Sequence, residues 1–365
     1  MGMVFPGLVI SFPCDGAVLT PMDGHWKEGR FQIFLEGSAS CPGIIRLNED
    51  RLFLERGPFR IPLDLNDHRS DFRIQWESSF GTEGKPLRLL WDRSIVKRYR
   101  FSVDDNILFL RDIARNPIQN IFQHPYLAFW RKMHNRYGSK IQLNIYYQDS
   151  EFNLSQISQR YRKQWENNRE WMRITFHARS DQPSRPYLTS DYNKMEKDYT
   201  LVTREIERWA GPSLLSPFTT IHWAEATRES CRALRDQGVR GLVGYFRFRD
   251  GHTYCSYYLN PDIVRHLEGR DAWMDCDEDI LFVKHDMVIN EIPLGKIREK
   301  LNILGSHPHQ GNILEFMVHE QYFRKDLPVF YQPNIEEKVE LAIRWASERG
   351  YRPAFYEEGF LGAVQ

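Results

Sequence analysis

Cysteine is scarce in this chain of 365 residues, and the scarcity excludes several kinds of site. The thiols are odd in number, lie far apart and form no Cys-x-x-Cys pair; they are Cys14, Cys41, Cys231, Cys255 and Cys276. Neither a zinc knuckle nor a dithiol redox centre is therefore indicated. Reduced thiols in a cytoplasmic protein are the simplest interpretation, because disulfide frameworks belong to oxidising compartments.

The chain also lacks net charge, long apolar runs and a secretory start. Forty-nine basic residues balance forty-nine acidic ones, so neither a nucleic acid nor an anionic membrane is expected as a partner. No apolar stretch approaches the length of a membrane span. The first six residues have no basic region and no long apolar core, so we expect no secretory signal. The sequence leaves the oligomeric state open.

Hydrophobic and aromatic residues, by contrast, are abundant. They make up 41% and 14% of the chain, which is enough for buried cores and excludes global disorder. The ten Trp and seventeen Tyr residues would suit a cleft that binds a carbohydrate, although most aromatic side chains serve a core. A length of 365 residues favours two domains.

Residues 1–98 have the pattern of an all-β domain. Turn signals such as Asp23-Gly24 and Pro42-Gly43 separate short apolar runs, and polar and apolar residues alternate in Phe72–Trp76. No amphipathic helix of ten residues is evident. We expect an immunoglobulin-like β-sandwich in this region, and we expect it to carry none of the chemistry.

Residues 99–365 change to alternating strands and helices, which predicts a parallel α/β barrel, complete or lacking a strand. Strands are expected at 100–106, 141–147, 172–177, 218–222, 241–246, 280–284, 313–319 and 352–356. Helices are expected at 107–114, 126–137, 156–167, 192–210, 227–237, 294–304 and 335–349. Gly138 and Gly238 are expected to end two of these helices.

Polar side chains stand at the ends of four of the predicted strands: Asp104 and Asp105, His177, His222 and His319. In a parallel barrel the carboxyl ends of the strands meet on one rim, where the chemistry of such folds takes place. Carboxylates and imidazoles gathered there suggest a divalent metal, because buried carboxylates without a partner are costly. The alternative for the two aspartates is that they only cap the next helix.

Further candidates flank these strand ends. Asp181 follows His177 by four residues and would share a metal with it if the segment turned helically, while His222 is the alternative third ligand. Substrate contacts are expected from Trp223, Glu225, Glu320 and Tyr322. Structural alternatives remain open, since Glu225 could belong to the start of the following helix and His319 could be a core histidine.

From about residue 100 to 356 the chain resembles the polysaccharide deacetylase (NodB-homology) family, on three stretches. Ser102–Asn106 is similar to the family's Thr-Phe-Asp-Asp-Gly, His177–Asp181 approximates its His-Ser/Thr-x-x-His, and Met317–His319 is similar to its Leu-x-His. The family's members are distorted (β/α)7 barrels that use a divalent metal to remove acetyl groups from sugars. Asn106 and Asp181 depart from the motifs, and the family's arginine has no counterpart near Thr220–Glu225.

The resemblance implies a role for each of these residues. Asp104 would be the catalytic base and His319 the acid that protonates the leaving group. Asp105, His177 and either Asp181 or His222 would hold zinc, cobalt or nickel, which accept mixed nitrogen and oxygen ligands.

The leading hypothesis is therefore a metal-dependent carbohydrate deacetylase. One alternative is a glycoside hydrolase without a metal, in which Asp104 or Asp105 pairs with Glu225 or Glu320. The other alternative is a non-catalytic carbohydrate-binding protein on a degenerate barrel.

Overall fold

The computed structural model describes residues 2–93 and 96–358, which divide into two compact units. The first unit contains residues 2–93 and 272–279, and the second contains 96–271 and 280–358. The segment 272–279 belongs to the first unit because its side chains bind there. The Trp273 indole donates to the Asp15 carbonyl at 2.7 Å, and Arg88 pairs with Asp277 at 2.6 Å. A domain boundary at residue 98 stays a prediction.

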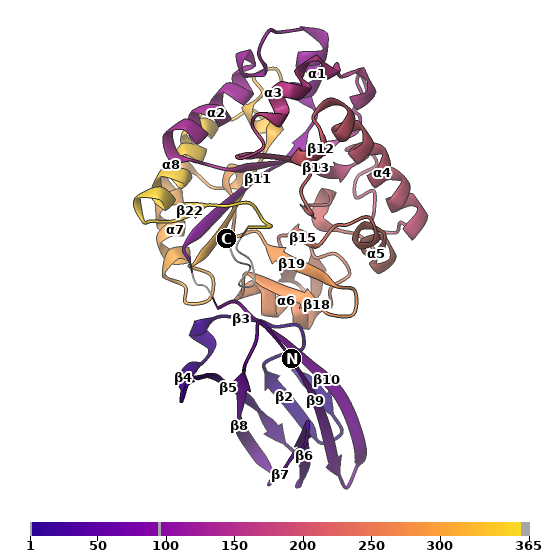
Figure 1. Cartoon of the computed structure of the whole chain (residues 1–365), viewed down its shortest axis with the longest axis vertical. Helices are drawn as coiled ribbons and strands as arrows, with labels where there is room; N and C mark the ends of the chain where they lie inside the picture. Colours follow the sequence, from indigo (N-terminus) through magenta and orange to yellow (C-terminus); the bar gives the residue numbers. More distant parts are fainter. Residues whose placement is uncertain (1, 94–95, 359–365) are drawn as a thin grey trace. The chain divides into compact units, whose positions relative to one another are not determined.

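The first unit is built from two five-stranded sheets, and apart from the parallel pair β3 and β10 its neighbouring strands are antiparallel (Figure 1). One sheet comprises β1 (Met3–Phe5), β2 (Leu8–Phe12), β4 (His25–Lys27), β5 (Arg30–Ala39) and β8 (Gly57–Leu65). The other comprises β3 (Val18–Leu19), β6 (Gly43–Leu47), β7 (Asp50–Leu54), β9 (Arg69–Ser78) and β10 (Gly81–Trp91). The immunoglobulin-like assignment of this unit stays a prediction.

Alternation along the strands explains the core of this unit. In β5, Phe31, Ile33 and Leu35 are buried while the residues between them are partly exposed, and Ile74 and Trp76 repeat the pattern in β9. The buried faces of both sheets contribute to one apolar cluster. Burial of each such side chain contributes about 1.5–3 kcal/mol before entropy is counted.

The second unit contains a ring of parallel strands, and its members in ring order are β11 (Arg98–Asn106), β12 (Ile141–Tyr146), β13 (Met172–Ala178), β14 (Phe218–Thr219), β15 (Gly241–Gly244), β19 (Ile280–Lys284), β20 (Met287–Val288) and β21 (Ile313–His319). Strand β19 pairs with β15, and β20, which follows it along the chain, pairs with β21. The join between β13 and β14 has little ladder pairing: it includes one parallel bridge, Ile174 to Leu215, and a hydrogen bond from the Thr219 hydroxyl to the Phe176 carbonyl. This mixed α/β architecture is of the (β/α) barrel type that the sequence predicted.

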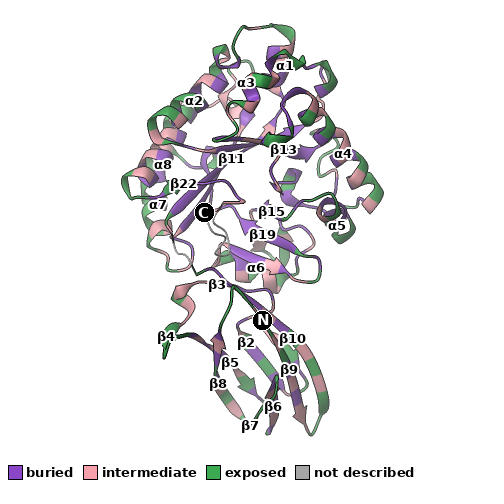
Figure 2. Ribbon diagram, viewed as in Figure 1, coloured by how far each residue is buried: buried purple, intermediate pink, exposed green. Residues whose placement is uncertain are grey.

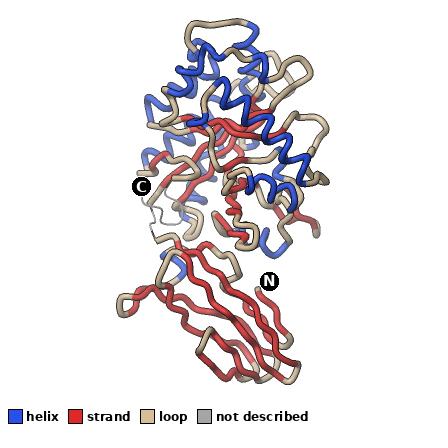
Figure 3. Tube along the Cα trace, turned by 45° about the vertical axis from the view of Figure 1, so that its right-hand side comes forward, coloured by secondary structure: helices blue, strands red, loops and turns tan. Residues whose placement is uncertain are grey.

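Helices surround this ring (Figures 1 and 3). They are α1 (Leu108–Arg115), α2 (Pro125–Tyr137), α3 (Arg162–Glu166), α4 (Tyr192–Trp209), α5 (Arg228–Asp236), α6 (Pro261–Glu268), α7 (Ile297–Ser306) and α8 (Ile335–Glu348). Every residue of β12 is buried, as expected for a strand that is covered on both faces (Figure 2). Gly138 and Gly238 adopt positive φ angles of 69° and 96° after α2 and α5, as predicted.

Several local predictions were wrong. The expected helix at 156–167 is broken into two 3-10 turns and α3, because Asn153 and Ser158 each cap a new turn with their side chains. The expected strand at 218–222 is only β14, and the one at 352–356 is only β22 (Arg352–Pro353). Helix α6 and the strands β16 (Arg247–Arg249), β17 (His252–Tyr254) and β18 (Ala272–Asp275) were not predicted.

The structure also bears on the predicted reduced cysteines and on the predicted lack of a membrane span. All five cysteines are described, and each is a free thiol. Among the described residues, no helix combines the length and the apolar character that crossing a bilayer requires.

Candidate functional site

The strand ends of the barrel surround one cavity of about 290 Å³. Its lining includes all five residues predicted at those ends: Asp104, Asp105, His177, His222 and His319. Asp104 and Asp105 belong to β11, His177 to β13 and His319 to β21, whereas His222 begins a 3-10 turn after β14. The carboxyl ends of distant strands thus meet at one place, as parallel barrel geometry requires.

Irregular backbone at the strand ends, rather than regular strand geometry, orients these side chains toward the cavity. The pairing of β11 with β12 shifts register between Val103 and Asn106, and Asp105 has a positive φ of 61°. The pairing of β12 with β13 skips His177, and Trp223 beside His222 has a φ of 66°. Bulges redirect side chains in this way, and a non-glycine residue at positive φ costs on the order of 1–3 kcal/mol.

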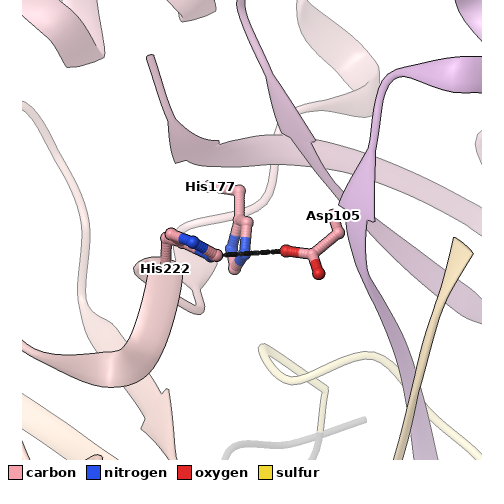
Figure 4. A group of neighbouring side chains, drawn as sticks. All are labelled: Asp105, His177 and His222. Atoms are coloured by element: carbon pink, nitrogen blue, oxygen red, sulfur yellow. Dashed lines mark hydrogen bonds and ion pairs between the residues drawn. The ribbon is translucent and has the colours of Figure 1, made fainter. Parts of the chain in front are cut away.

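Asp105, His177 and His222 direct one ligand atom each toward a common point (Figure 4). Asp105 Oδ1 lies 3.1 Å from His177 Nε2 and 3.3 Å from His222 Nδ1, and the two nitrogens are 3.2 Å apart. A tetrahedral zinc ion with bonds of about 2.0 Å would hold its ligand atoms about 3.3 Å apart. The spacing of the three atoms, which we call the triad, therefore suits an ion of this size.

The opposite atoms of the same side chains have partners that fix their orientation. These pairs are His177 Nδ1 with the Thr220 carbonyl at 2.5 Å, His222 Nε2 with Asp181 Oδ1 at 3.2 Å, and Asp105 Oδ2 with Gln321 Nε2 at 2.8 Å. A carbonyl oxygen only accepts, so His177 Nδ1 carries a proton, and Nε2 is the ring nitrogen that points into the triad. Partners of this kind typically orient metal ligands.

The charges within the triad attract one another. Burial opposes ionisation of Asp105, but its contacts with His177 and His222 hold its pKa well below the usual range. Burial also acts against protonated His222, yet Asp105 and Asp181 raise the pKa of this imidazole to about 9. The site thus favours a positive charge beside Asp105, which a proton or a metal ion can supply.

The donor set fits a divalent transition metal. Two imidazole nitrogens and one carboxylate oxygen suit zinc, cobalt and nickel, and three protein ligands leave a position open for a further group. The three side chains can therefore hold such an ion.

Asp104 and His319 lie beside the triad on paired strands, where they are direct register partners. Asp104 is buried and accepts a hydrogen bond from Asn144 Nδ2 at 2.5 Å. Asn290 Oδ1 lies 3.0 Å from His319 Nδ1. Because amide oxygens only accept, His319 Nδ1 is protonated, and Nε2 is left for another partner.

Two of the predicted substrate contacts line the cavity: Trp223 and Tyr322. Trp223 is 45% exposed, and its ring centroid lies 5.9 Å from that of His222. Tyr322 lies against His319 at the same centroid distance. Both rings are therefore available to a molecule in the cavity.

The other two predicted contacts need correction, since neither glutamate lines the cavity. Glu320 is fully buried and accepts the backbone N–H groups of Ile107, Leu108 and Phe109, so it caps the start of α1. Burial raises the pKa of this carboxyl to about 7 against the effect of those three N–H groups. Glu225 is buried 3.4 Å from Arg185. Neither glutamate therefore offers the cavity the second carboxylate that the glycoside hydrolase alternative requires.

The structure also does not place Asp181 as a direct metal ligand. The expected helical turn after His177 does not form, because β13 continues to Ala178 and a bend follows. Asp181 instead contacts His222 Nε2, on the side of the ring away from Asp105. It therefore orients and polarises a ligand candidate.

Sequence reasoning missed Tyr146, Gln321 and His285. The Tyr146 hydroxyl donates a hydrogen bond to Asp105 Oδ1, and burial together with Asp105 raises the pKa of this phenol well above its usual range. His285 lines the cavity, and burial lowers its pKa to about 4, so its ring is neutral. Tyr146 and His285 both end or follow an apolar strand, so the signal that found His177 could have found them.

No protein-family model and no curated protein matches this sequence. Solved structures with a similar chain trace do exist. A CE4 family pseudoenzyme from Bacillus anthracis is 10% identical with a TM-score of 0.34, and the match covers 78% of this chain and 81% of that chain.

Two further structures are similar at the same low level. A 4-alpha-glucanotransferase from Thermococcus litoralis is 12% identical with a TM-score of 0.42, over 72% of this chain and 40% of that chain. A peptidoglycan N-acetylglucosamine deacetylase is 8% identical with a TM-score of 0.35, over 72% and 87% of the two chains. At these TM-scores and identities the resemblance to the three structures is distant.

Proposed function

We propose that this protein is a metal-dependent hydrolase that removes acetyl groups from a carbohydrate. The observation that carries the proposal is the convergence of Asp105, His177 and His222 beside a cavity that Asp104 and His319 also line. Zinc is the first choice for the ion, with cobalt or nickel as substitutes, because the donor set is two nitrogens and one oxygen.

The ion would supply Lewis acidity, which lowers the pKa of water and stabilises negative charge on a carbonyl oxygen. Asp104 then accepts the proton that water gives up as it attacks the acetyl carbon. His319 delivers a proton from Nε2 to the leaving nitrogen or oxygen of the sugar, while Asn290 holds the ring through Nδ1. Proton removal and proton delivery thus fall to neighbouring residues of β11 and β21.

A carbohydrate is the proposed substrate because aromatic rings border the cavity. Trp223, Tyr322 and Tyr245 contribute to its lining beside the polar triad. The apolar faces of sugar rings pack on flat aromatic side chains, and their hydroxyl groups need polar partners nearby. Trp223 is the most suitable platform because it is half exposed.

We further propose that residues 1–98 form an immunoglobulin-like sandwich without catalytic residues and that residues 99–365 form a distorted (β/α)7 barrel. All of the proposed site residues lie in the barrel unit, between Asp104 and Tyr322.

The test combines metal analysis with acetate release from N-acetylated and O-acetylated oligosaccharides. The parent protein should contain one transition-metal ion per chain and release acetate. His177→Ala should lose both, whereas His252→Ala, at an exposed histidine of the same unit, should lose neither. A parent that takes up no metal after reconstitution, or one that holds metal and releases no acetate, would contradict the proposal.

A further inference from the structure

Two side chains contact the imidazole of His319, the proposed proton donor. Asn290 Oδ1 lies 3.0 Å from His319 Nδ1, and the Tyr322 ring lies at a centroid distance of 5.9 Å. Asn290 belongs to a 3-10 turn after β20, whereas Tyr322 follows β21 along the chain. Residues of two separate segments therefore have to be held together if the His319 ring is to keep its place.

Gln332, which precedes α8, bridges the backbone of these two segments. Its Nε2 donates a hydrogen bond to the Asn290 carbonyl at 3.0 Å. Its backbone N–H donates to the Tyr322 carbonyl, also at 3.0 Å. A single residue thus binds both of the residues that contact His319.

The side chain of Lys338 in α8 fixes the orientation of the Gln332 amide. Lys338 Nζ donates to Gln332 Oε1 at 2.7 Å and lies 3.5 Å from the Asn290 carbonyl. An ammonium group only donates, so the amide oxygen has to face Lys338, and the amide nitrogen is left for the carbonyl of Asn290. We call Gln332 and Lys338 the clamp.

The lysine of the clamp is unfavourable for folding. Lys338 is 5% exposed, and burial lowers the pKa of its amine. The two acceptors that it contacts are an amide oxygen and a backbone carbonyl, which carry no charge to balance an ammonium group. Because a buried charge without a counter-ion is costly, an apolar side chain would serve stability better at this position.

We propose that Gln332 and Lys338 are positioning residues that hold His319 in place for proton delivery to the leaving group. This inference rests on the role of His319 in the proposed function. Neither residue lines the cavity, so both act through Asn290 and Tyr322 rather than on the substrate. Loss of the clamp should therefore slow the step that needs the proton and leave substrate binding and metal content unchanged.

The experiment uses the full-length, zinc-loaded protein and two substrates that differ in their leaving group. An N-acetylated oligosaccharide needs a proton on its leaving nitrogen, whereas p-nitrophenyl acetate releases a stable phenolate without one. Gln332→Glu gives Lys338 a counter-ion but removes the donor to the Asn290 carbonyl. Its kcat on the oligosaccharide should fall about 10-fold at unchanged KM, while its rate on the ester stays parental. Its midpoint of urea unfolding should equal or exceed that of the parent.

Lys338→Met should act in the same direction, and Lys300→Met, at an exposed lysine of α7, is the matched control that should leave both rates unchanged. Equal losses of Gln332→Glu on both substrates would overturn the inference, because that result belongs to a residue that only supports the fold. Parental turnover of Gln332→Glu on the oligosaccharide would overturn it too. A parent that releases no acetate from the oligosaccharide would instead contradict the proposed function, and the inference would fall with it.

Discussion

The barrel contains two groups of polar side chains that differ in what surrounds them: a buried ion pair and the triad. Strand β11 contributes Arg100 to the ion pair and Asp105 to the triad, while β21 contributes Glu315 to the ion pair. Arg100 and Glu315 are completely buried and form an ion pair, and the lining of the cavity includes neither. The triad, in contrast, directs three possible metal-ligand atoms toward one point at the edge of the cavity.

The comparison teaches that buried charge alone does not indicate function. In the first group the Arg100 guanidinium faces the Glu315 carboxylate, so a cation and an anion of the chain pair directly. Burial raises the pKa of Glu315 to about 7 although Arg100 favours its ionised form. In the triad a carboxylate and two imidazoles converge, and either a proton or a metal ion can supply the positive charge beside Asp105.

Removal of one partner of the buried ion pair should have the largest effect. Arg100→Met leaves Glu315 without its cation and should lower the free energy of unfolding by about 3–5 kcal/mol. Metal content per folded chain should stay unchanged. Urea unfolding and metal analysis check both, and a variant that kept its stability but lost the ion would break the comparison.

Asp104→Asn should come next. The substitution removes a proton acceptor and leaves the volume of the side chain nearly unchanged, so turnover should fall by roughly 10² or more. Metal stoichiometry and stability should match those of the parent. Steady-state acetate release is the measurement, with Asp250→Asn, at an exposed turn, as the control. Near-parental turnover would remove Asp104 from its proposed role.

Asp181→Ala should have a smaller effect, because this carboxylate contacts a ligand candidate rather than the common point. We expect zinc affinity to fall about 10- to 100-fold as His222 loses its orienting partner. Turnover at saturating zinc should change little. A competition titration with a chelator measures the affinity, and complete loss of the site would instead favour direct ligation by Asp181.

Trp223→Ala should have the smallest effect. Loss of an exposed aromatic platform should raise KM up to about 10-fold and leave kcat and metal content unchanged. Kinetics on acetylated oligosaccharides of increasing length give the two parameters separately. An unchanged KM for every substrate would exclude Trp223 from sugar binding.

The fold was largely readable from local pattern, and the errors have local causes. Alternation predicted β9 in the first unit, and apolar runs predicted β12, β13 and β21 in the barrel. A continuous helix was predicted at 156–167 because the apolar residues there have helical spacing. The side chains of Asn153 and Ser158 instead cap separate short turns and divide the segment. Helix α6 was missed although Asn260 caps it and Pro261 begins it.

The site was less predictable because two of its features depend on backbone that sequence patterns do not reveal. The pattern placed Asp105, His177 and His222 at strand ends, and they do meet at one cavity. It put Asp181 beside His177 through an imagined helical turn, whereas the chain bends and brings Asp181 to His222. It also predicted that Glu320 contacts the substrate, whereas this carboxylate accepts hydrogen bonds from three backbone N–H groups at the start of α1.

The sequence by itself determined the long strands of the barrel and the polar residues that end them, because side-chain pattern and turn residues act over a few neighbours. Only the tertiary structure decided which of those residues share a point. The bulges at Asp105 and His177 and the positive φ at Trp223 turn the side chains inward, and Tyr146 and Gln321 reach Asp105 from elements far apart in the chain. Such contacts depend on how the whole ring of strands closes, a constraint that no short stretch of sequence contains.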